Sequence, residues 1–318
     1  MMGLSFPVLL LLVIGFFFGW LLLLKFKLLF ISLLALILGY KSIAVFIGFN
    51  APVSFTTQKQ TGAIRVVSWN VARFIELARN NNAGSNIRKK MLALLKEQKA
   101  DILCLQEFHT SENPGFYNNI RAIREELGFS YHYFPYDKDG DRNYYSSVIF
   151  SRFPIVDSAL LRYPRPSQPE VLVQADIQVN NDTIRVFTTH LQSQRFDKLD
   201  YARMQKIKSR EDSLVYHSIP IVAKLKRGIV IRSIQADIIG EVRSNSPYPV
   251  LFTGDLNDVP NSYTYFKVRG ELRDAFLEKG YGLGRTFRGL SPTLRIDYIF
   301  SDSRFSVAQF KREKKNYS

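Results

Sequence analysis

With 318 residues, of which 46% are hydrophobic, the chain is long enough for one large domain or two ordinary ones with a substantial core. Its formal charge of +15 favours polyanionic partners, namely nucleic acid, phospholipid headgroups or phosphorylated small molecules, and charge alone does not choose among them. The single cysteine, Cys104, excludes an intramolecular disulfide. It lies in the apolar run 102–105, where we expect it to pack as a small buried hydrophobe.

Two apolar stretches open the chain. Residues 6–24 contain no charged residue and are long enough to cross a bilayer as a helix, and residues 28–49 form a second run interrupted only by Lys41. We interpret residues 1–50 as a membrane segment with two transmembrane helices that form a hairpin. A signal peptide or a buried core hairpin is the alternative, but the first run lacks the basic start and the small-residue end of a signal peptide.

The two runs are joined by Lys25-Phe26-Lys27, which is too short to do more than turn the chain at a membrane face. Lysines in short loops favour the cytoplasmic side, so this turn is predicted inside and both termini outside. The large polar domain is then extracytoplasmic. Lys41 lies within the second predicted span and must extend its amine to the interface or line a polar contact.

A polar linker at residues 51–62 precedes the remaining domain, residues 63–318. Strand and helix patterns alternate at the start of this domain, and the second strand delivers Glu107 at its end. In chain order we predict a strand at 63–70, a helix with its apolar face within 87–95, a strand at 101–106 and a helix at 117–127. This rhythm indicates an α/β domain with buried strands.

Strands at short spacing follow, at 130–135, 146–150, 155–161, 171–179 and 183–190. The turn sequence Asn180-Asn181-Asp182 joins the last two as an antiparallel hairpin, so a mixed sheet is expected. Residues 200–243 are predicted to be helical, with a break or kink at Pro220. This region is basic, and we read it either as a phosphate-backbone or lipid-headgroup surface or as a solvated helix face. Its basic residues are Arg203, Lys206, Lys208, Arg210, Lys224, Lys226, Arg227 and Arg232.

The stretch 249–258 is an apolar strand that ends in Gly254, and polar side chains follow at once. Asp255 and Asn257 are two positions apart, so they point the same way if the alternation of the strand persists. The pattern suits a carboxylate and an amide that converge on one phosphate or metal, and it also suits a simple turn. A helical turn at 263–268 and a last strand at 294–300, which carries Asp297, complete the predicted elements.

Strand ends thus present the residue types that phosphoryl hydrolysis requires. They are Asn70, Glu107, His190, Asp255, Asn257 and Asp297. A glutamate and an asparagine can satisfy a hard ion such as Mg²⁺, which keeps several waters. A histidine and an asparagine can donate to phosphoryl oxygens, and an aspartate can orient or deprotonate the attacking water. Each residue alone is more often structural, and their joint occurrence favours a site.

These residues lie in motifs that together resemble the endonuclease/exonuclease/phosphatase family, which has the fold of pancreatic deoxyribonuclease. The motifs are Ser68-Trp69-Asn70, Leu105-Gln106-Glu107, Ser146 to Ile155, Thr188-Thr189-His190-Leu191-Gln192, Gly254-Asp255-Leu256-Asn257-Asp258 and Arg295-Ile296-Asp297-Tyr298-Ile299-Phe300. The two spans and the stretch 257–262 are similar to a membrane-anchored branch found in bacteria of the Bacteroidetes type. That branch implies a bacterial inner membrane location, with the catalytic domain outside the cytoplasm.

The resemblance implies a four-layer α/β/β/α sandwich and a metal-dependent phosphoesterase that cleaves a phosphodiester or phosphomonoester by water attack. It implies that Asn70 and Glu107 hold Mg²⁺ or Mn²⁺, and that His190 and Asn257 contact the scissile phosphate. Asp255 would position or activate the water. Asp297 would orient a second histidine, in a terminal Ser-Asp-His motif followed by a strand.

That second histidine is absent, because the chain stops at Ser318, where the serine of the motif would fall. We expect the natural gene to continue with Asp-His, so that residues 63–318 lack a last strand. The alternative function is a catalytically impaired, membrane-tethered module that binds nucleic acid or anionic lipid. In either case we expect a monomer.

Overall fold

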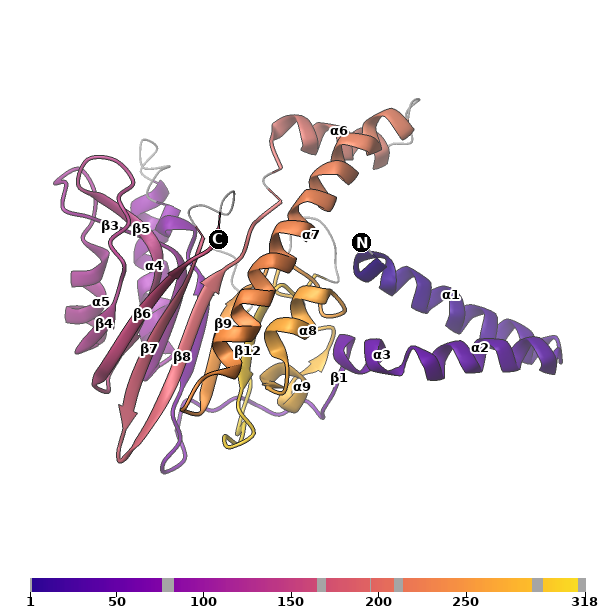
Figure 1. Cartoon of the computed structure of the whole chain (residues 1–318), viewed down its shortest axis with the longest axis horizontal. Helices are drawn as coiled ribbons and strands as arrows, with labels where there is room; N and C mark the ends of the chain where they lie inside the picture. Colours follow the sequence, from indigo (N-terminus) through magenta and orange to yellow (C-terminus); the bar gives the residue numbers. More distant parts are fainter. Residues whose placement is uncertain are drawn as a thin grey trace.

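The computed structural model describes residues 2–75, 83–164, 170–194, 196–208, 214–287 and 294–313 (Figure 1). Two β-sheets form the centre of this part of the chain. The larger sheet has the order β10-β12-β9-β8-β7-β6 and the smaller has the order β2-β3-β5-β4. The larger sheet contains β6 (Ile155–Arg162), β7 (Val171–Val179), β8 (Asp182–His190), β9 (Val250–Asp255), β10 (Arg273–Asp274) and β12 (Asp297–Ser301). The smaller contains β2 (Val66–Asn70), β3 (Ile102–Ser111), β4 (Tyr131–Tyr133) and β5 (Asn143–Ser151).

The two sheets pack face to face, and helices cover both outer faces (Figure 1). Apolar side chains between the sheets form one core cluster, which includes Cys104, Ile149 and Val186. The smaller sheet is covered by α4 (Ala83–Glu97) and α5 (Asn119–Leu127), and the larger by α7 (Leu214–Ser244) and α8 (Tyr263–Arg269). The predicted four-layer α/β/β/α sandwich is therefore confirmed, and Cys104 is buried as predicted.

Both sheets combine parallel and antiparallel pairs, as the sequence predicts. The pairs β2–β3 and β8–β9 are parallel, whereas β7–β8 is the predicted antiparallel hairpin. Asn180 in the hairpin turn has a φ of 54°, a left-handed conformation that asparagine tolerates better than most residues. The strands of a parallel pair run in the same direction. The carboxyl end of β2 therefore lies beside β3, and the carboxyl ends of β8 and β9 lie together.

Two predicted element boundaries are wrong. Strand β3 continues to Ser111, so Glu107 lies within the strand, at a register shift between Leu105 and Phe108. Helix α7 continues through Pro220, so the chain does not break there, because a 31-residue helix can absorb the loss of one backbone hydrogen bond. The predicted basic residue Arg210 and the terminal residues 316–318 lie outside the described residues.

The N-terminal residues form a helical hairpin that projects from the sandwich (Figure 1). Helix α1 (Met2–Leu22) is the one described helix that is by itself long and apolar enough to cross a membrane. The returning arm consists of α2 (Phe26–Leu38) and α3 (Tyr40–Phe46), bent by 61°, and it qualifies only if the bent pair counts as one span. Lys41 lies beyond the bend, at the end of the hairpin nearest the sandwich, where a lysine can reach headgroups.

The returning arm is fixed to the sandwich by hydrogen bonds. Arg295 Nη2 donates to the carbonyl of Val45 at 2.8 Å, and Asn50 Nδ2 donates to the carbonyl of Leu277 at 2.8 Å. Strand β1 (Gly48–Phe49) pairs with β11 (Tyr281–Gly282), next to the short helix α9 (Ala275–Lys279). The hairpin therefore leaves the sandwich in a defined direction.

Candidate active site

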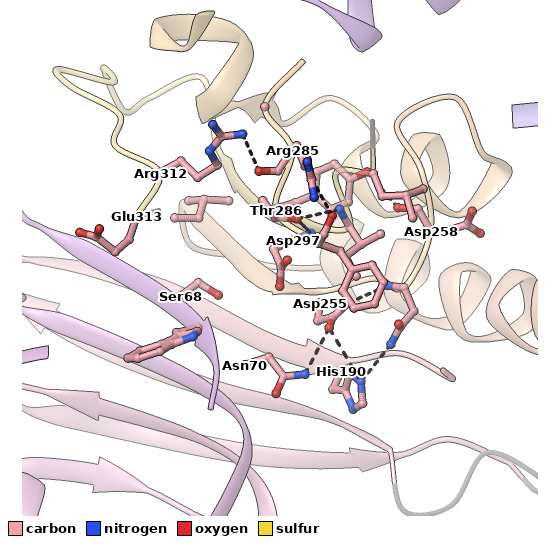
Figure 2. Close-up of a pocket in the computed structure, with 18 of the residues that line it drawn as sticks. Ser68, Asn70, His190, Asp255, Asp258, Arg285, Thr286, Asp297, Arg312 and Glu313 are labelled. Carbon is pink, nitrogen blue, oxygen red and sulfur yellow. Dashed lines mark hydrogen bonds and ion pairs between the residues drawn. The ribbon is translucent and has the colours of Figure 1, made fainter. Parts of the chain in front are cut away.

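The strand ends of both sheets meet at one edge and bring the predicted residues together (Figure 2). In the larger sheet, Asp255 is the register partner of His190 on one side and of Asp297 on the other. In the smaller sheet, Asn70 ends β2 beside Gln106, one residue before Glu107. The six predicted positions thus come from both sheets, although they lie far apart in the sequence.

Asn70 connects the two sheets at this edge. Its Nδ2 donates to Glu107 Oε1 at 3.0 Å and to Asp255 Oδ2 at 3.2 Å. Its Oδ1 accepts from the backbone N–H of Ala72 at 3.0 Å, so the orientation of the amide is set from both ends. One side chain therefore holds the carboxylates of β3 and β9 in a fixed relation.

Asp255 and Asn257 form the simple turn that the sequence allows as the alternative to a phosphate or metal site. Asp255 Oδ1 accepts from the backbone N–H of Asn257 at 2.9 Å, and Leu256 between them points into the core. Asn257 Nδ2 donates to the carbonyl of Leu191 at 2.9 Å and lies 2.9 Å from His190 Nε2. The turn reading of the motif is therefore confirmed, and the turn places the amide beside the imidazole.

The geometry around His190 indicates its protonation in this arrangement. The carbonyl oxygen of Leu191 fixes Asn257 Nδ2 as a donor, so His190 Nε2 accepts from it and the proton of the neutral ring is on Nδ1. Nε2 also lies 3.6 Å from Glu107 Oε1 and 4.0 Å from Asp255 Oδ2. A protonated ring would therefore face two carboxylates.

Unusual backbone geometry places three of these positions. Glu107 has a φ of 48° and Asn257 a φ of 50°, both in the left-handed region. Residues held in such conformations cluster at functional sites, where the surrounding structure maintains them. At Gly254, a Cβ would lie 2.4 Å from the carbonyl oxygen of Thr189, so only glycine allows β8 and β9 to approach this closely before Asp255.

Two carboxylates at the edge, Asp255 and Asp297, have raised pKa values. Burial raises the pKa of Asp255, and the charge of Glu107 raises it further, against hydrogen bonds from Asn257 and Asn70. Burial and the charge of Asp255 likewise raise the pKa of Asp297. A hydrogen bond from Thr286 opposes this shift, and Thr286 Oγ1 also accepts from the N–H of Asp297 at 3.2 Å. Sequence reasoning missed Thr286, because no motif contains it.

A buried ion pair beneath the edge was also missed. Arg232 of α7 is 1% exposed, its Nε donates to Asp258 Oδ2 at 3.1 Å, and its Nη1 donates to the carbonyl of Gln192 at 3.0 Å. It ties the segment after β8 to the segment after β9. The basic pattern of residues 200–243 predicts that Arg232 lies on a surface. This prediction is wrong, because Arg232 is buried against Asp258, a partner that is distant in the sequence.

The donor set at the edge fits a hard divalent cation. Within the described ranges, no group of three or more His, Cys, Asp or Glu side chains is arranged to hold a metal. Glu107 and Asn70 nevertheless lie on adjoining strands, and Mg²⁺ commonly uses one or two protein oxygens and keeps its waters. Glu107 can offer a carboxylate oxygen directly, whereas Asn70 would offer its amide oxygen only after the amide turns from its present hydrogen bonds. The raised pKa values of Asp255 and Asp297 show that negative charge is unfavourable at this edge, and such an ion would neutralise it.

The edge opens into a cleft of 1410 Å³. The predicted residues form its polar end, and Arg285 and Arg312 lie across from Asp255 (Figure 2). The wall is also apolar in part, and it includes Leu4 of α1, Leu225 of α7 and Phe287. A phosphate group can therefore be held near cations while the rest of a substrate contacts apolar side chains.

Solved structures share this fold. An endonuclease/exonuclease/phosphatase family protein from Bacteroides thetaiotaomicron superposes with a TM-score of 0.55 and 17% identity, covering 77% of this chain and 85% of that one. Humanized TDP2 of D. rerio, which carries 14 mutations, superposes with a TM-score of 0.52 and 17% identity, covering 76% and 83%. At such identity the likeness concerns the fold alone.

No curated protein matches this chain. Residues 67–314 match the sequence model of the Endonuclease/Exonuclease/phosphatase family. This match spans most of the sandwich, including both sheets and every predicted site residue. The chain therefore belongs to the Endonuclease/Exonuclease/phosphatase family.

Proposed function

We propose that the chain is a membrane-anchored, metal-dependent phosphoesterase that hydrolyses a phosphodiester or phosphomonoester by direct attack of water. The observation that carries the proposal is the junction at Asn70, whose amide holds carboxylates of both sheets beside His190 and Asn257. The family description, which names nucleases and phosphatases, supports the reaction class. The substrate is a nucleic acid, a phospholipid or a phosphorylated small molecule.

Asn70 and Glu107 would hold Mg²⁺ or Mn²⁺, which when bound polarises a phosphoryl oxygen and neutralises negative charge. Asp255 Oδ2 orients the attacking water and takes its proton. His190 and Asn257 face the same space and would donate hydrogen bonds to the non-bridging phosphoryl oxygens. For this role His190 Nε2 must carry a proton, and the hydrogen bond between Asn257 Nδ2 and His190 Nε2 must give way to hydrogen bonds to the substrate. Asp297 lies next to Asp255 in the register. Because its pKa is raised to about 8, it would add negative charge at the metal side only once it is ionised.

The hairpin would anchor this domain as a monomer outside the cytoplasm, at the bacterial inner membrane. The length and composition of α1 and the defined exit of the returning arm support an anchor. In this arrangement Lys25 and Lys27 lie at the far end of the hairpin from the sandwich (Figure 1). Lysines in a short turn favour the cytoplasmic side, which leaves the sandwich on the other side.

The test uses the full chain in nanodiscs with bis-p-nitrophenyl phosphate and p-nitrophenyl phosphate. We expect turnover with Mg²⁺ that is lost in EDTA, and Asp255→Asn should lower kcat by about 10²–10⁴-fold, the usual contribution of a positioned general base. The matched control is Asp182→Asn, in the exposed hairpin turn before β8. Turnover that survives EDTA, or Asp255→Asn equal to the control, contradicts the mechanism. Metal-independent binding of nucleic acid or anionic lipid without turnover would favour a binding module instead.

A further inference from the structure

Helix α7 and its partner α6 (Lys198–Lys208) extend beyond the strands as an arm (Figure 1). One side of α7 packs on the sandwich. The opposite side exposes an apolar stripe at helical spacing, formed by Ile219, Val222, Val230 and Ile234. A surface helix normally presents polar residues on its outer side, and a helix that is apolar on both sides is normally covered on both. The exposed apolar stripe therefore indicates a surface that binds a partner.

The charges beside the stripe indicate an anionic partner. Residues 214–236 contain no aspartate or glutamate. Lys224 donates to Asp197 Oδ2 at 3.0 Å and also pairs with Asp200, so α6 neutralises it. Lys226 and Arg227 are exposed, and no ion pair to them occurs in the part of the chain that the structure describes. Lys226 lies within the stripe, four residues from both Val222 and Val230, and Arg227 lies beside it. Apolar side chains interspersed with unneutralised cations are compatible with a helix that lies on an anionic bilayer.

The stripe lies on the side of the sandwich from which the hairpin leaves. Asp237, one turn after Ile234, accepts from Tyr263 Oη of α8 at 2.5 Å, so α8 flanks the same side of α7. Gly3 of α1 abuts the loop just before α8, where a Cβ would lie 3.1 Å from Val259 and 3.3 Å from the carbonyl oxygen of Asn261. The first turn of α1 thus contacts the loop before α8, and α8 contacts α7 just beyond the end of the stripe.

Exposed aromatic side chains mark the same level at the base of the hairpin. Phe49 and Tyr281 are register partners in the β1–β11 pair, and both are exposed, as is Tyr40 at the bend. Tyrosine and other aromatic side chains at the ends of membrane helices commonly lie among the headgroups. Arg295 fixes α3, which precedes β1, to the sandwich.

We propose that the outer side of α7, residues 219–234, is a docking surface for an anionic lipid bilayer, and that docking holds the mouth of the cleft at the headgroups. The cleft is lined by Leu4 of α1 and Leu225 of α7, so its wall joins the anchor to the arm. The inference rests on the membrane anchor of the proposed function. It does not depend on catalysis, and its test measures position rather than turnover.

The test labels single introduced cysteines with a nitrobenzoxadiazole dye in the full chain, since buried Cys104 is shielded. The chain is placed in nanodiscs of phosphatidylcholine and phosphatidylglycerol that carry nitroxide-labelled lipid. The arm is probed by Val230→Cys and the anchor by Leu12→Cys. Val156→Cys is the matched exposed apolar control, on the edge strand β6 at the opposite end of the larger sheet from β10.

We expect a blue shift and lipid quenching at positions 12 and 230 and neither at position 156. Quenching at 12 without any at 230 overturns the docking surface and leaves the anchor intact. The absence of quenching at 12 overturns the anchor and, with it, the inference. A blue shift at 230 that rises with protein concentration, without lipid quenching, assigns the stripe to contact between copies and also overturns the proposal.

A charge test uses the same probe at position 230. Lys226→Ala and Arg227→Ala should each shift the equilibrium between docked and free arm about fivefold, the equivalent of about 1 kcal/mol for a cation near an anionic surface. Lys99→Ala, at an exposed lysine beside α4 on the other outer layer, is the control. Equal quenching in all three variants, or in nanodiscs without phosphatidylglycerol, contradicts the electrostatic part of the proposal.

Discussion

Two fully buried arginines serve different regions of the molecule. Arg232 lies under the cleft, paired with Asp258 and the carbonyl of Gln192. Arg295 lies under the base of the hairpin, where it pairs with Asp274 at 2.5 Å and donates to the carbonyl of Val45. Both side chains are only 1% exposed. Each arginine joins segments that are distant in the sequence, but one joins two loops of the candidate site and the other joins the N-terminal hairpin to the sandwich.

The difference lies in what surrounds each charge. Around Arg295 the contacts are aromatic, with the guanidinium 4.6 Å from the ring centre of Phe276 and 4.9 Å from that of Tyr298. Around Arg232 the neighbours are polar, and Thr264 shares its partner Asp258 through a 2.9 Å hydrogen bond. The candidate site and the base of the hairpin are therefore held largely by different side chains. Tyr298 links them, because its hydroxyl lies 2.9 Å from the carbonyl of Asp258 and 2.7 Å from that of Arg295.

Arg232→Met should have the largest effect, because it damages both stability and catalysis. Removing one partner of a buried pair leaves an uncompensated charge, which costs about 3–5 kcal/mol. The loops that carry Asn257 would also lose their tie, so kcat should fall. Urea unfolding followed by tryptophan fluorescence and kcat with p-nitrophenyl phosphate measure the two effects.

The double variant Arg232→Met/Asp258→Leu separates the two effects. Replacing both partners with apolar residues of similar size can restore stability. We expect recovery of the urea midpoint without full recovery of kcat. A double variant with wild-type kcat would show that Arg232 only stabilises the fold and does not position the catalytic loops.

Arg295→Met should cost a similar 3–5 kcal/mol, for the same physical reason, while kcat on a small soluble substrate is retained. The base of the hairpin should loosen, because Val45 loses its hydrogen bond. Hydrogen exchange of α3 and β1 in nanodiscs should therefore rise, with exchange at β9 unchanged at matched stability. A loss of kcat equal to that of Arg232→Met would show that the two networks are coupled.

The catalytic edge has its own pH signature, carried by Asp297. Its pKa is raised above the ordinary 3.8 by burial and by Asp255, so the folded chain binds this proton more tightly than the unfolded chain does. The stabilising contribution is complete below the ordinary value and is lost as pH rises through the raised pKa. The slope is at most about 1.4 kcal/mol per pH unit for one proton.

Urea midpoints in EDTA from pH 4 to pH 9 measure this slope, and Asp297→Asn should flatten it. Asp274→Asn, which changes the ion-pair partner of Arg295, should leave the slope of the urea midpoint with pH unchanged. A steep slope that persists in Asp297→Asn assigns the effect to another group. Arg232→Met and Arg295→Met distinguish the two regions by removing contacts, whereas Asp297→Asn distinguishes them by removing a titratable charge.

The sequence predicted the layers and the site residues because periodicity and strand ends are local features. The two-residue spacing of Asp255 and Asn257 predicted that their side chains point the same way. The parallel pairing of β8 with β9 then brings His190 beside Asp255. What the sequence could not predict depends on partners brought together from afar. Glu107 lies at a register shift inside β3, and Arg232 is buried because Asp258 meets it 26 positions later.

The N-terminal helices show the same division. Hydropathy identified both runs, yet the 61° bend that places Lys41 at the base of the hairpin depends on how α3 meets the sandwich. Thr286 was missed for a similar reason, since only the fold brings it beside Asp297. Local pattern therefore determines which residues are candidates, and long-range pairing determines how they are held.

The smallest expected effect is on the reactivity of the Cys104 thiol. Its labelling rate reports whether the loss of either arginine also opens the core between the two sheets. Cys104 lies between the two sheets, outside both arginine networks, and burial raises its pKa to about 12. At pH 8 only about one thiol in ten thousand is ionised at that pKa, so Ellman's reagent should not react with the folded chain. Labelling then requires opening of the inter-sheet core.

If both arginine variants open this core only by global unfolding, their labelling rates should rise in proportion to their loss of stability, whichever arginine is replaced. A control in urea, where the thiol is free, fixes the maximal rate. Fast labelling of one variant at matched stability would mean that its break reaches the space between the sheets. Because Cys104 contacts Thr253 of β9, two residues before Asp255, Arg232→Met is the variant in which such spreading would first be detected.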